Sequence, residues 1–214
     1  MSEYGTTGKD EKVDVVLLNV AFTQLLALSD VETVSVLVQG LNLASKDVIF
    51  CAVSNSRDVT NARSGTHWSL LVLELSTEGR HICCSHFDSL EGSPNASFSR
   101  ELGKKLVAGI TGGDKVTVVH KEGTGVPSQS NAHDCGLYVL SLTDLILRGL
   151  NSEESTESTS STAVEAICAK DSLWSSKLIR ERVSGMRSHL LRVIDEERKR
   201  EVEELLKKNF PQLM

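Results

Sequence analysis

Residues 129–139 read Gln129-Ser-Asn-Ala-His-Asp-Cys135-Gly-Leu-Tyr-Val139, and this stretch places a cysteine where a polar loop turns into an apolar helix. A helix N-terminus carries roughly half a positive charge, which favours a thiolate over a thiol. Gly136 leaves the space beside the sulfur open to the backbone of a substrate. Cys135 is therefore a candidate nucleophile, although most free cysteines are simply small buried residues.

Three further polar residues could complete a site around this cysteine. His67 stands at the start of an apolar strand, where it could act as a general base toward Cys135. Asp88 ends the next strand, so in a hairpin it falls beside His67 and could fix the tautomer of the ring. Gln129 could direct an amide N–H at an oxyanion. Each residue alone has a common structural explanation, but the ordered set favours a shared catalytic role.

The composition indicates one globular domain with a protein as its partner. The chain has 214 residues, of which 40% are apolar and 24% charged, and its formal net charge is −6. This length suffices for a single core. Because no dense Lys/Arg block stands apart from acidic neighbours, the sequence argues against nucleic acid or an anionic membrane as a partner.

The cysteines indicate a reducing compartment. An odd number that includes an adjacent pair does not fit a secreted disulfide framework. The N-terminus is polar without an apolar signal core, and no apolar run approaches the ~20 residues that span a bilayer. We therefore expect the cytoplasm, the nucleus or both. The five cysteines are Cys51, Cys83, Cys84, Cys135 and Cys168.

Hydrophobic periodicity predicts a mixture of helices and strands without a regular βαβ repeat, hence an α+β fold. Helices are expected over 15–28, 31–38, 97–110 and 135–148, and strands over 48–53, 68–75, 81–87 and 116–119. A long helical stretch over 173–209 follows, and Gly185 is expected to interrupt it.

The motifs around His67, Asp88, Gln129 and Cys135 together resemble those of the ubiquitin-like-protein-specific cysteine proteases, the sentrin-specific or SUMO-protease-type family. The resemblance covers residues 15–210. Within the family, the sequence Gly65-Thr-His-Trp-Ser-Leu-Leu-Val72 looks closest to the deneddylase branch. The matching motifs are Thr66-His67-Trp68-Ser69-Leu70-Leu71, Phe87-Asp88-Ser89 and Gln129-x-Asn131-x-x-Asp134-Cys135-Gly136.

The resemblance implies a papain-like architecture of the ubiquitin-like protease type, with a mixed central sheet and the nucleophile at a helix N-terminus. It implies that Cys135 is the nucleophile, His67 the base, Asp88 its orienting group and Gln129 the oxyanion donor. Trp68 and Gly136 would bind the substrate. The resemblance implies neither a cofactor nor a metal.

It also implies one protease domain over residues 1–214. Its expected parts are a flexible N-terminus (1–12), a catalytic core (13–149), a disordered acidic Ser/Thr insert (151–162) and a C-terminal helical segment (173–209).

The implied function is a peptidase and isopeptidase that cleaves after the C-terminal Gly-Gly of a ubiquitin-like modifier. We expect the Rub/Nedd modifier and conjugates such as cullins as partners, and a monomeric enzyme. The alternatives are a SUMO-specific protease and a weakly active or inactive modifier-binding homologue. The last alternative arises because family members carry a further tunnel-forming segment upstream of Leu18, which is expected to be missing here. His133 also replaces a usual aromatic residue.

Two other interpretations start from single segments. His81-Ile-Cys83-Cys84-Ser-His86 could suggest a metal site, but strand alternation would point the two cysteines to opposite faces. The charged stretch 195–208 could suggest a coiled coil, but it lacks sustained heptads and favours a solvated helical face.

Overall fold

The computed structural model describes residues 13–58, 64–76, 81–151, 162–170 and 175–209. The predictions of a flexible N-terminus (1–12) and a disordered insert (151–162) fall almost entirely outside these ranges and stay predictions. The elements, in chain order, are β1 (Val15–Leu17), α1 (Val20–Leu28), α2 (Val31–Gly40), the 3₁₀ turn η1 (Leu43–Ser45), β2 (Val48–Ser54), β3 (Trp68–Leu75), β4 (His81–Phe87), α3 (Ala96–Thr111), β5 (Thr117–Glu122), α4 (Cys135–Leu150), α5 (Ala163–Ala169) and α6 (Ser176–Asn209).

A mixed five-stranded sheet forms the centre of the molecule, in the order β1-β2-β3-β4-β5. The two outer strands pair in parallel with their neighbours, and β2, β3 and β4 pair antiparallel. The predicted strands over 68–75 and 81–87 are confirmed as a hairpin with the same bounds. The expected α+β class with a mixed central sheet is confirmed as well.

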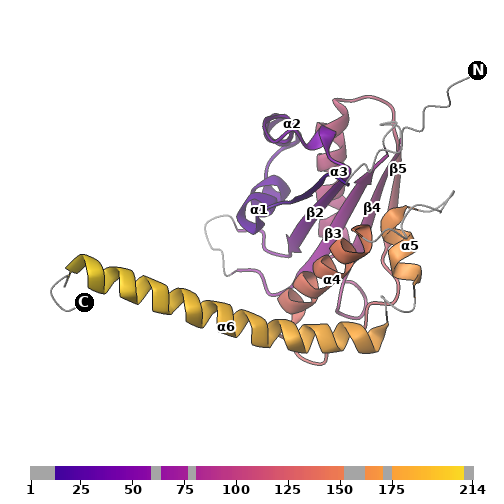
Figure 1. The fold of residues 1–214 in the computed structure, drawn as a ribbon. Coiled ribbons are helices and arrows are strands. Elements are labelled where there is room, and N and C mark those ends of the chain that lie inside the picture. The colour runs from indigo at the N-terminus through magenta and orange to yellow at the C-terminus, as the bar shows by residue number, and fades with distance from the viewer. Residues whose placement is uncertain (1–12, 59–63, 77–80, 152–161, 171–174, 210–214) are drawn as a thin grey trace, which may run out of the picture.

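Helices cover both faces of the sheet, because side chains of the central strands alternate between two apolar layers. One layer packs Phe50, Leu70 and Val72 against α4, α5 and the start of α6. The other packs Ile49 and Leu71, with their neighbours, against α1, α2 and α3. Figure 1 shows the two groups of helices on opposite sides of the strands. This sandwich explains why β2 and β3 are apolar at nearly every position.

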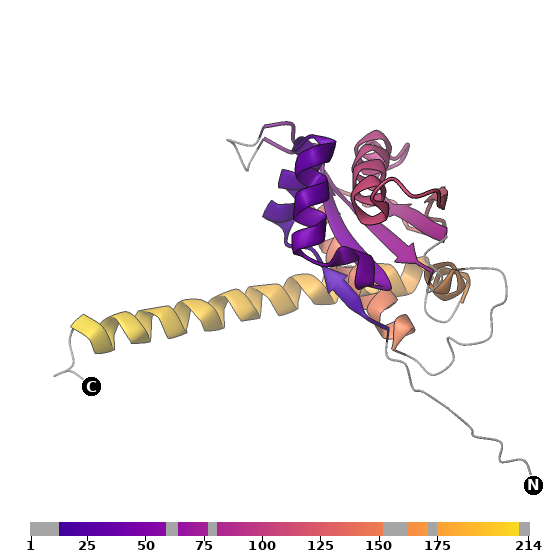
Figure 2. The same cartoon turned by 90° about the horizontal axis from the view of Figure 1, so that it is seen from above.

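The long helix α6 packs on the body only through its first turns. Ile179 and Val183 are buried, whereas Leu191, Ile194 and Val202 are exposed. The remainder of the helix projects away from the sheet, as the view from above makes plain (Figure 2). Within the described residues, no helix is both long and apolar enough to cross a membrane.

The prediction of one helix over 15–28 is wrong at its start. Val15–Leu17 forms the edge strand β1, which pairs with β2, and Asn19 then caps α1 by accepting the N–H of Ala21 at 2.9 Å. Over so short a segment, apolar residues at 16, 17 and 20 fit the period of a helix as well as that of a strand. The parallel pairing with β2, which no local pattern encodes, decides the conformation.

Three other elements differ from the prediction. Helix α6 runs continuously through Gly185, because one glycine inside a long helix costs only about 1 kcal/mol relative to alanine. Strand β5 extends to Glu122 instead of ending at Val119, because β4 supplies backbone partners along its whole length. Helix α5 was not predicted, since its seven residues show too little periodicity, and the burial of Val164 and Ile167 holds it in place.

Candidate active site

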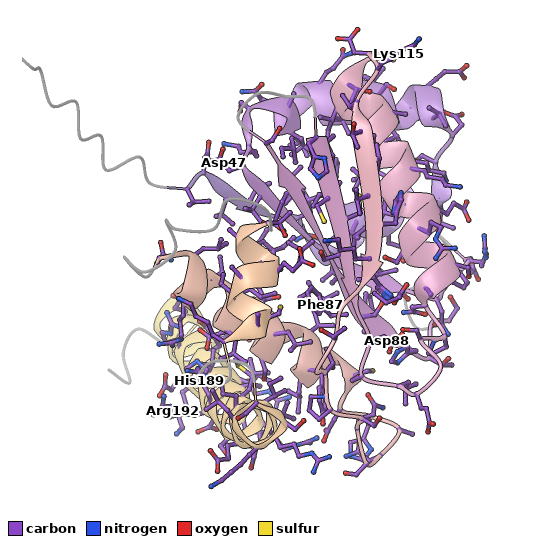
Figure 3. All side chains as sticks on the ribbon, turned by 90° about the vertical axis from the view of Figure 1, so that its right-hand side faces the viewer. Asp47, Phe87, Asp88, Lys115, His189 and Arg192 are labelled. Carbon is purple, nitrogen blue, oxygen red and sulfur yellow. The ribbon has the colours of Figure 1, made fainter. Side chains whose placement is uncertain are left out.

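His67 and Asp88 meet at one end of the β3–β4 hairpin. His67 directly precedes β3, Asp88 directly follows β4, and the antiparallel register sets Leu70 opposite Phe87. The His67 Nε2 atom lies 2.6 Å from Asp88 Oδ1, and their side chains are 4% and 0% exposed. Figure 3 shows Phe87 and Asp88 at the end of the sheet away from Asp47 and Lys115. The predicted pairing of these two side chains is therefore present.

This pairing determines which ring nitrogen of His67 is available as a base. An ionised carboxylate only accepts hydrogen bonds, so Nε2 carries the proton that bonds to Asp88. The other nitrogen, Nδ1, then keeps its lone pair. Nδ1 is buried and has no hydrogen-bond partner among the residues that the structure describes. The imidazole thus presents an unused basic nitrogen in a place shielded from solvent.

Asp88 is itself held by main-chain donors. Its Oδ1 also accepts the N–H of Leu90 at 2.9 Å, and its Oδ2 accepts the N–H of Asn95 at 3.3 Å. Main-chain donors stabilise the charged form of a carboxylate. They also leave Asp88 little freedom to turn away from the histidine.

Two asparagines that the sequence did not single out fix the backbone around His67. Asn55 Oδ1 accepts the N–H groups of Thr66 and His67 at 2.8 and 3.1 Å. Asn95 is fully buried, and its Nδ2 lies 3.4 Å from the carbonyl of His67. Asn95 precedes α3, where it would be interpreted as an N-cap, yet its side chain makes no cap bond. No local signal distinguishes such residues from ordinary turn formers.

Cys135 is the first residue of α4, as predicted, and is 6% exposed. The preceding residue, Asp134, makes no side-chain cap to this helix. Its carboxylate instead accepts the Asn131 amide at 2.7 Å and pairs with Arg187 of α6. The Asn131 hydrogen bond, with help from Arg187, holds the pKa of Asp134 below its usual value. The N-terminal end of α4 is thus left without a side-chain cap beside the thiol.

Gln129 lies next to His67 but its amide is already engaged. Ser89 Oγ donates to Gln129 Oε1 at 2.7 Å, and Gln129 Nε2 donates to the carbonyl of Asn131 at 2.6 Å. An amide nitrogen has two hydrogens, so one donor remains for a ligand. Gln129 and His67 line the same open pocket of about 470 Å³, together with Asn55, Thr66, Leu90, Pro94, Ser130, Asn131 and Ala132.

The structure therefore joins His67 to Asp88 and places Gln129 at the same pocket. In the described part of the chain, no hydrogen bond joins the Cys135 sulfur to His67. Such bonds are often long in unliganded enzymes and tighten when substrate binds.

The two predicted substrate-binding residues have different surroundings. Trp68 is half-buried and packs on the apolar layer that includes Tyr138 and Val139 from the first turn of α4. Gly136 faces open space, since a Cβ placed there would meet no atom of the described residues within 4 Å beyond its own stretch of helix. The structure thus leaves room for a substrate backbone at Gly136.

The His81–His86 segment is built as part of the core. Cys84 lies in the layer beneath α3, and burial raises the pKa of its thiol to about 12. Cys83 points the other way, toward Ser85. Within the described ranges, no three His, Cys, Asp or Glu side chains gather as they would to hold a metal ion.

The comparison with family models decides which family this arrangement represents. Residues 9–183 match the model of the Ulp1 protease family, C-terminal catalytic domain. The chain belongs to the Ulp1 protease family. The resemblance inferred from the His67, Asp88 and Cys135 motifs is confirmed.

Similar proteins in the family are named after the ubiquitin-like modifiers sentrin and NEDD8. The chain is 32% identical over 118 residues to Sentrin-specific protease 8 of Rattus norvegicus, covering 55% of this chain and 50% of the relative. It is 32% identical over 125 residues to NEDD8-specific protease 1 of Arabidopsis thaliana, covering 58% and 51%. The chain thus spans about half the length of these relatives.

Solved structures of the family are more distant in sequence. The Ulp1 protease domain in complex with Smt3, the yeast ortholog of SUMO, is 22% identical with a TM-score of 0.43, over 60% of this chain and 55% of that one. Ulp1 with its catalytic cysteine oxidised to a sulfinic acid is 20% identical with a TM-score of 0.46, over 79% and 70%. The family assignment rests on the sequence match.

Proposed function

We propose that this chain is a cysteine-type peptidase and isopeptidase that cleaves after the C-terminal Gly-Gly of a ubiquitin-like modifier. The observation that carries the proposal is the state of His67. Its Nε2 bonds to the buried carboxylate of Asp88, while its Nδ1 is buried and unpartnered. A general base held in this way is what a thiol at a helix N-terminus needs to become a nucleophile.

In the proposed reaction, the Cys135 thiol transfers its proton to His67 Nδ1 as the sulfur attacks the carbonyl carbon of the terminal glycine. Asp88 orients the ring and stabilises the imidazolium that results. The backbone N–H of Cys135 and the second amide hydrogen of Gln129 bind the oxyanion.

Collapse of the tetrahedral intermediate breaks the C–N bond. The leaving amine takes the proton from His67 and departs, while the acyl group stays on Cys135 as a thioester. A water molecule then attacks the thioester carbonyl and gives a proton to His67. The second collapse returns this proton to the sulfur and releases the carboxylic acid of the modifier, which loses its remaining proton to solvent.

The proposed substrate specificity follows from the surroundings of Cys135. Glycine residues lack side chains, so we expect a Gly-Gly end to fit at the open face of Gly136 and to contact Trp68. We propose the Rub/Nedd modifier as the preferred substrate, with cullin conjugates as targets. Two observations support this preference. The sequence of Gly65–Val72 resembles the deneddylase branch, and the Arabidopsis relative is named NEDD8-specific protease 1. The unpaired cysteines support action in the cytoplasm or nucleus.

The experiment uses three modifiers, NEDD8, SUMO and ubiquitin, each with a C-terminal electrophile that traps an active cysteine. We expect a covalent adduct that forms fastest with NEDD8, that maps to Cys135, and that is lost in Cys135→Ala. Cys168→Ala serves as a matched control, because it removes a thiol outside the site and leaves labelling unchanged. Faster labelling by the SUMO probe would replace the Rub/Nedd preference with SUMO specificity. No Cys135 adduct with any of the three would refute the protease.

A further inference from the structure

A second histidine, His86, lies buried behind the candidate site and has no part in the proposed reaction. It stands on β4 two residues before Asp88, and its side chain is 4% exposed. Its Nδ1 lies 2.8 Å from Glu122 Oε2 on β5, and its Nε2 lies 2.9 Å from Ser69 Oγ on β3. His86 therefore links three neighbouring strands through its two ring nitrogens.

The link continues from Ser69 to both members of the histidine–carboxylate pair. Asn95 Nδ2 donates to Ser69 Oγ at 3.1 Å, and the same amide lies within 3.4 Å of the His67 carbonyl. The main-chain N–H of Asn95 bonds to Asp88 Oδ2 at 3.3 Å. Ser69 is 1% exposed and Asn95 is 0% exposed. One chain of hydrogen bonds thus runs from the half-exposed carboxylate of Glu122 through buried His86, Ser69 and Asn95 to the groups that orient His67.

The donors and acceptors in this chain have one consistent direction. The Glu122 carboxylate only accepts, so His86 Nδ1 carries the proton and Nε2 is the acceptor. The Ser69 hydroxyl then donates to Nε2, which leaves its oxygen free to accept from Asn95. The Asn95 amide has two hydrogens. One goes to Ser69 Oγ, and the other lies between the carbonyls of Val53, at 3.1 Å, and His67, at 3.4 Å. Such directional chains hold their members in a single arrangement.

We propose that His86, Ser69 and Asn95 are positioning residues, whose hydrogen-bond chain fixes Asp88 and the backbone of His67 so that Nδ1 serves as the base for Cys135. The inference rests on the proposed function for the role of Cys135, and it adds three residues that act on the reaction through His67 and Asp88.

Stability alone does not account for this chain. Burying polar side chains in an apolar layer costs desolvation, which the new hydrogen bonds roughly offset. Cys84 and Leu71, which face the same layer, show that an apolar residue suits this part of the sheet. The polar chain therefore contributes a fixed geometry at the end of the hairpin where His67 and Asp88 lie.

The test measures the rate at which iodoacetamide alkylates Cys135 in the full chain as a function of pH, with the modified residue identified by mass spectrometry. This rate reports the thiolate that His67 supports, and it requires no modifier. The variants are Ser69→Ala, His86→Leu and His86→Gln. Ser85→Ala is the matched control, because this buried serine adjoins His86 on β4 but faces the opposite layer.

We expect Ser69→Ala and His86→Leu to alkylate about tenfold more slowly at neutral pH, the change that one lost buried hydrogen bond corresponds to, with the profile displaced to higher pH. His86→Gln retains an oxygen that can accept from Ser69, so its rate should stay within about threefold of the original. Ser85→Ala should leave the profile unchanged. Circular dichroism verifies that each variant is folded, and Ser69→Ala carries the test if His86→Leu is not.

The outcomes separate this inference from the proposed function. If the original chain alkylates at Cys135 no faster than His67→Ala does, the proposed function fails. If it alkylates faster than His67→Ala while Ser69→Ala matches the original, the proposed function stands and the positioning role is wrong. Equal losses in His86→Gln and His86→Leu would also overturn the positioning role.

Discussion

His67 has one ring nitrogen bonded to Asp88 and the other unpartnered, and this asymmetry depends on the charge of a single carboxyl group. Asp88 accepts hydrogen bonds from the ring and from the N–H groups of Leu90 and Asn95. Three donors converge on its two oxygens. A side chain at position 88 that could also donate a hydrogen bond would disturb this arrangement, because the bond to Nε2 fixes the tautomer of His67.

Asp88→Asn is predicted to lower the rate of modifier cleavage by about 10²- to 10⁴-fold, the range that general acid–base catalysis contributes. The introduced amide would donate to Nε2 and move the ring proton to Nδ1, which then could no longer accept the thiol proton. Steady-state cleavage of a modifier precursor measures the effect. Asp114→Asn, at an exposed carboxylate, is the control and should cleave normally. Cleavage by Asp88→Asn at the original rate would contradict the assigned tautomer.

At the scale of secondary-structure elements, α5 is held on the body by a buried carboxylate. Glu74 of β3 accepts the N–H of Val164 at 2.9 Å, although the residues are 90 positions apart, and Glu74 is 8% exposed. Burial raises the pKa of Glu74 above its ordinary value of 4.5. The folded state therefore favours the protonated acid, and its charge at neutral pH opposes folding.

Glu74→Gln is predicted to maintain or raise the free energy of unfolding at neutral pH, because glutamine still accepts the Val164 N–H without a buried charge. The pKa is raised in the fold, so protonation stabilises the fold below pH 4.5, and this stability is lost as the pH rises through the folded-state pKa. The gain in free energy of unfolding of Glu74→Gln over the original chain should therefore shrink as the pH falls below the folded-state pKa of Glu74. Urea denaturation at several pH values measures this, and a variant less stable at pH 7 than at pH 4 relative to the original would contradict it.

Gly185 lies in the interior of α6, and Gly185→Ala is predicted to stabilise the protein by up to about 1 kcal/mol. Alanine loses less backbone entropy in a helix than glycine does. A Cβ at this position would meet no other atom within 4 Å, so no steric cost opposes the gain. Thermal melting followed by circular dichroism measures the shift. Gly149→Ala is the contrasting variant, because its Cβ would lie 2.6 Å from Ile167 and should destabilise the contact between α4 and α5.

At the scale of the whole molecule, α6 has a docked part and a projecting part. Ile179 and Val183 enter the core, while Arg182 pairs with Asp144 of α4 at 2.5 Å and Arg187 pairs with Asp134 beside Cys135. Beyond these contacts the helix extends away from the sheet (Figure 2). The docked turns thus contribute both to the core and to the loop that precedes Cys135.

A chain that ends at Ser188 is predicted to keep the thermal stability and the Cys135 labelling rate of the full chain. The described side chains of the deleted turns contribute none of the core residues and include charged pairs within the helix itself, such as Lys199 with Asp195. Exposed pairs of this kind contribute little to stability, because water screens the two charges. Melting curves and probe labelling measure the outcome. A large loss of stability would show that the projecting part supports the body.

Elements formed by interactions within a short segment agree with the prediction, whereas elements that depend on residues far along the chain do not. Strands 68–75 and 81–87 follow from composition and boundary signals within each segment, and they place His67 and Asp88 at one end of a hairpin. The helix that begins at Cys135 is equally local. The prediction is wrong for Val15–Leu17 because the conformation of this segment depends on β2. It omits α5 because seven residues show too little periodicity, and because this helix is held by Thr162 and by the distant Glu74.

The β3–β4 hairpin and the helix at Cys135 are predictable from the residues alone, because hydrophobic periods and boundary signals lie within short segments. The ordered set of His67, Asp88, Gln129 and Cys135 is likewise a matter of short motifs. The three-dimensional arrangement is needed to show that Nδ1 of His67 is free and that the Gln129 amide is partly engaged. It is also needed to show that His86, Ser69 and Asn95 form one chain behind Asp88. Hydrogen bonds are directional and join atoms whose positions depend on strand register and on loops far along the chain. No local pattern encodes such distances.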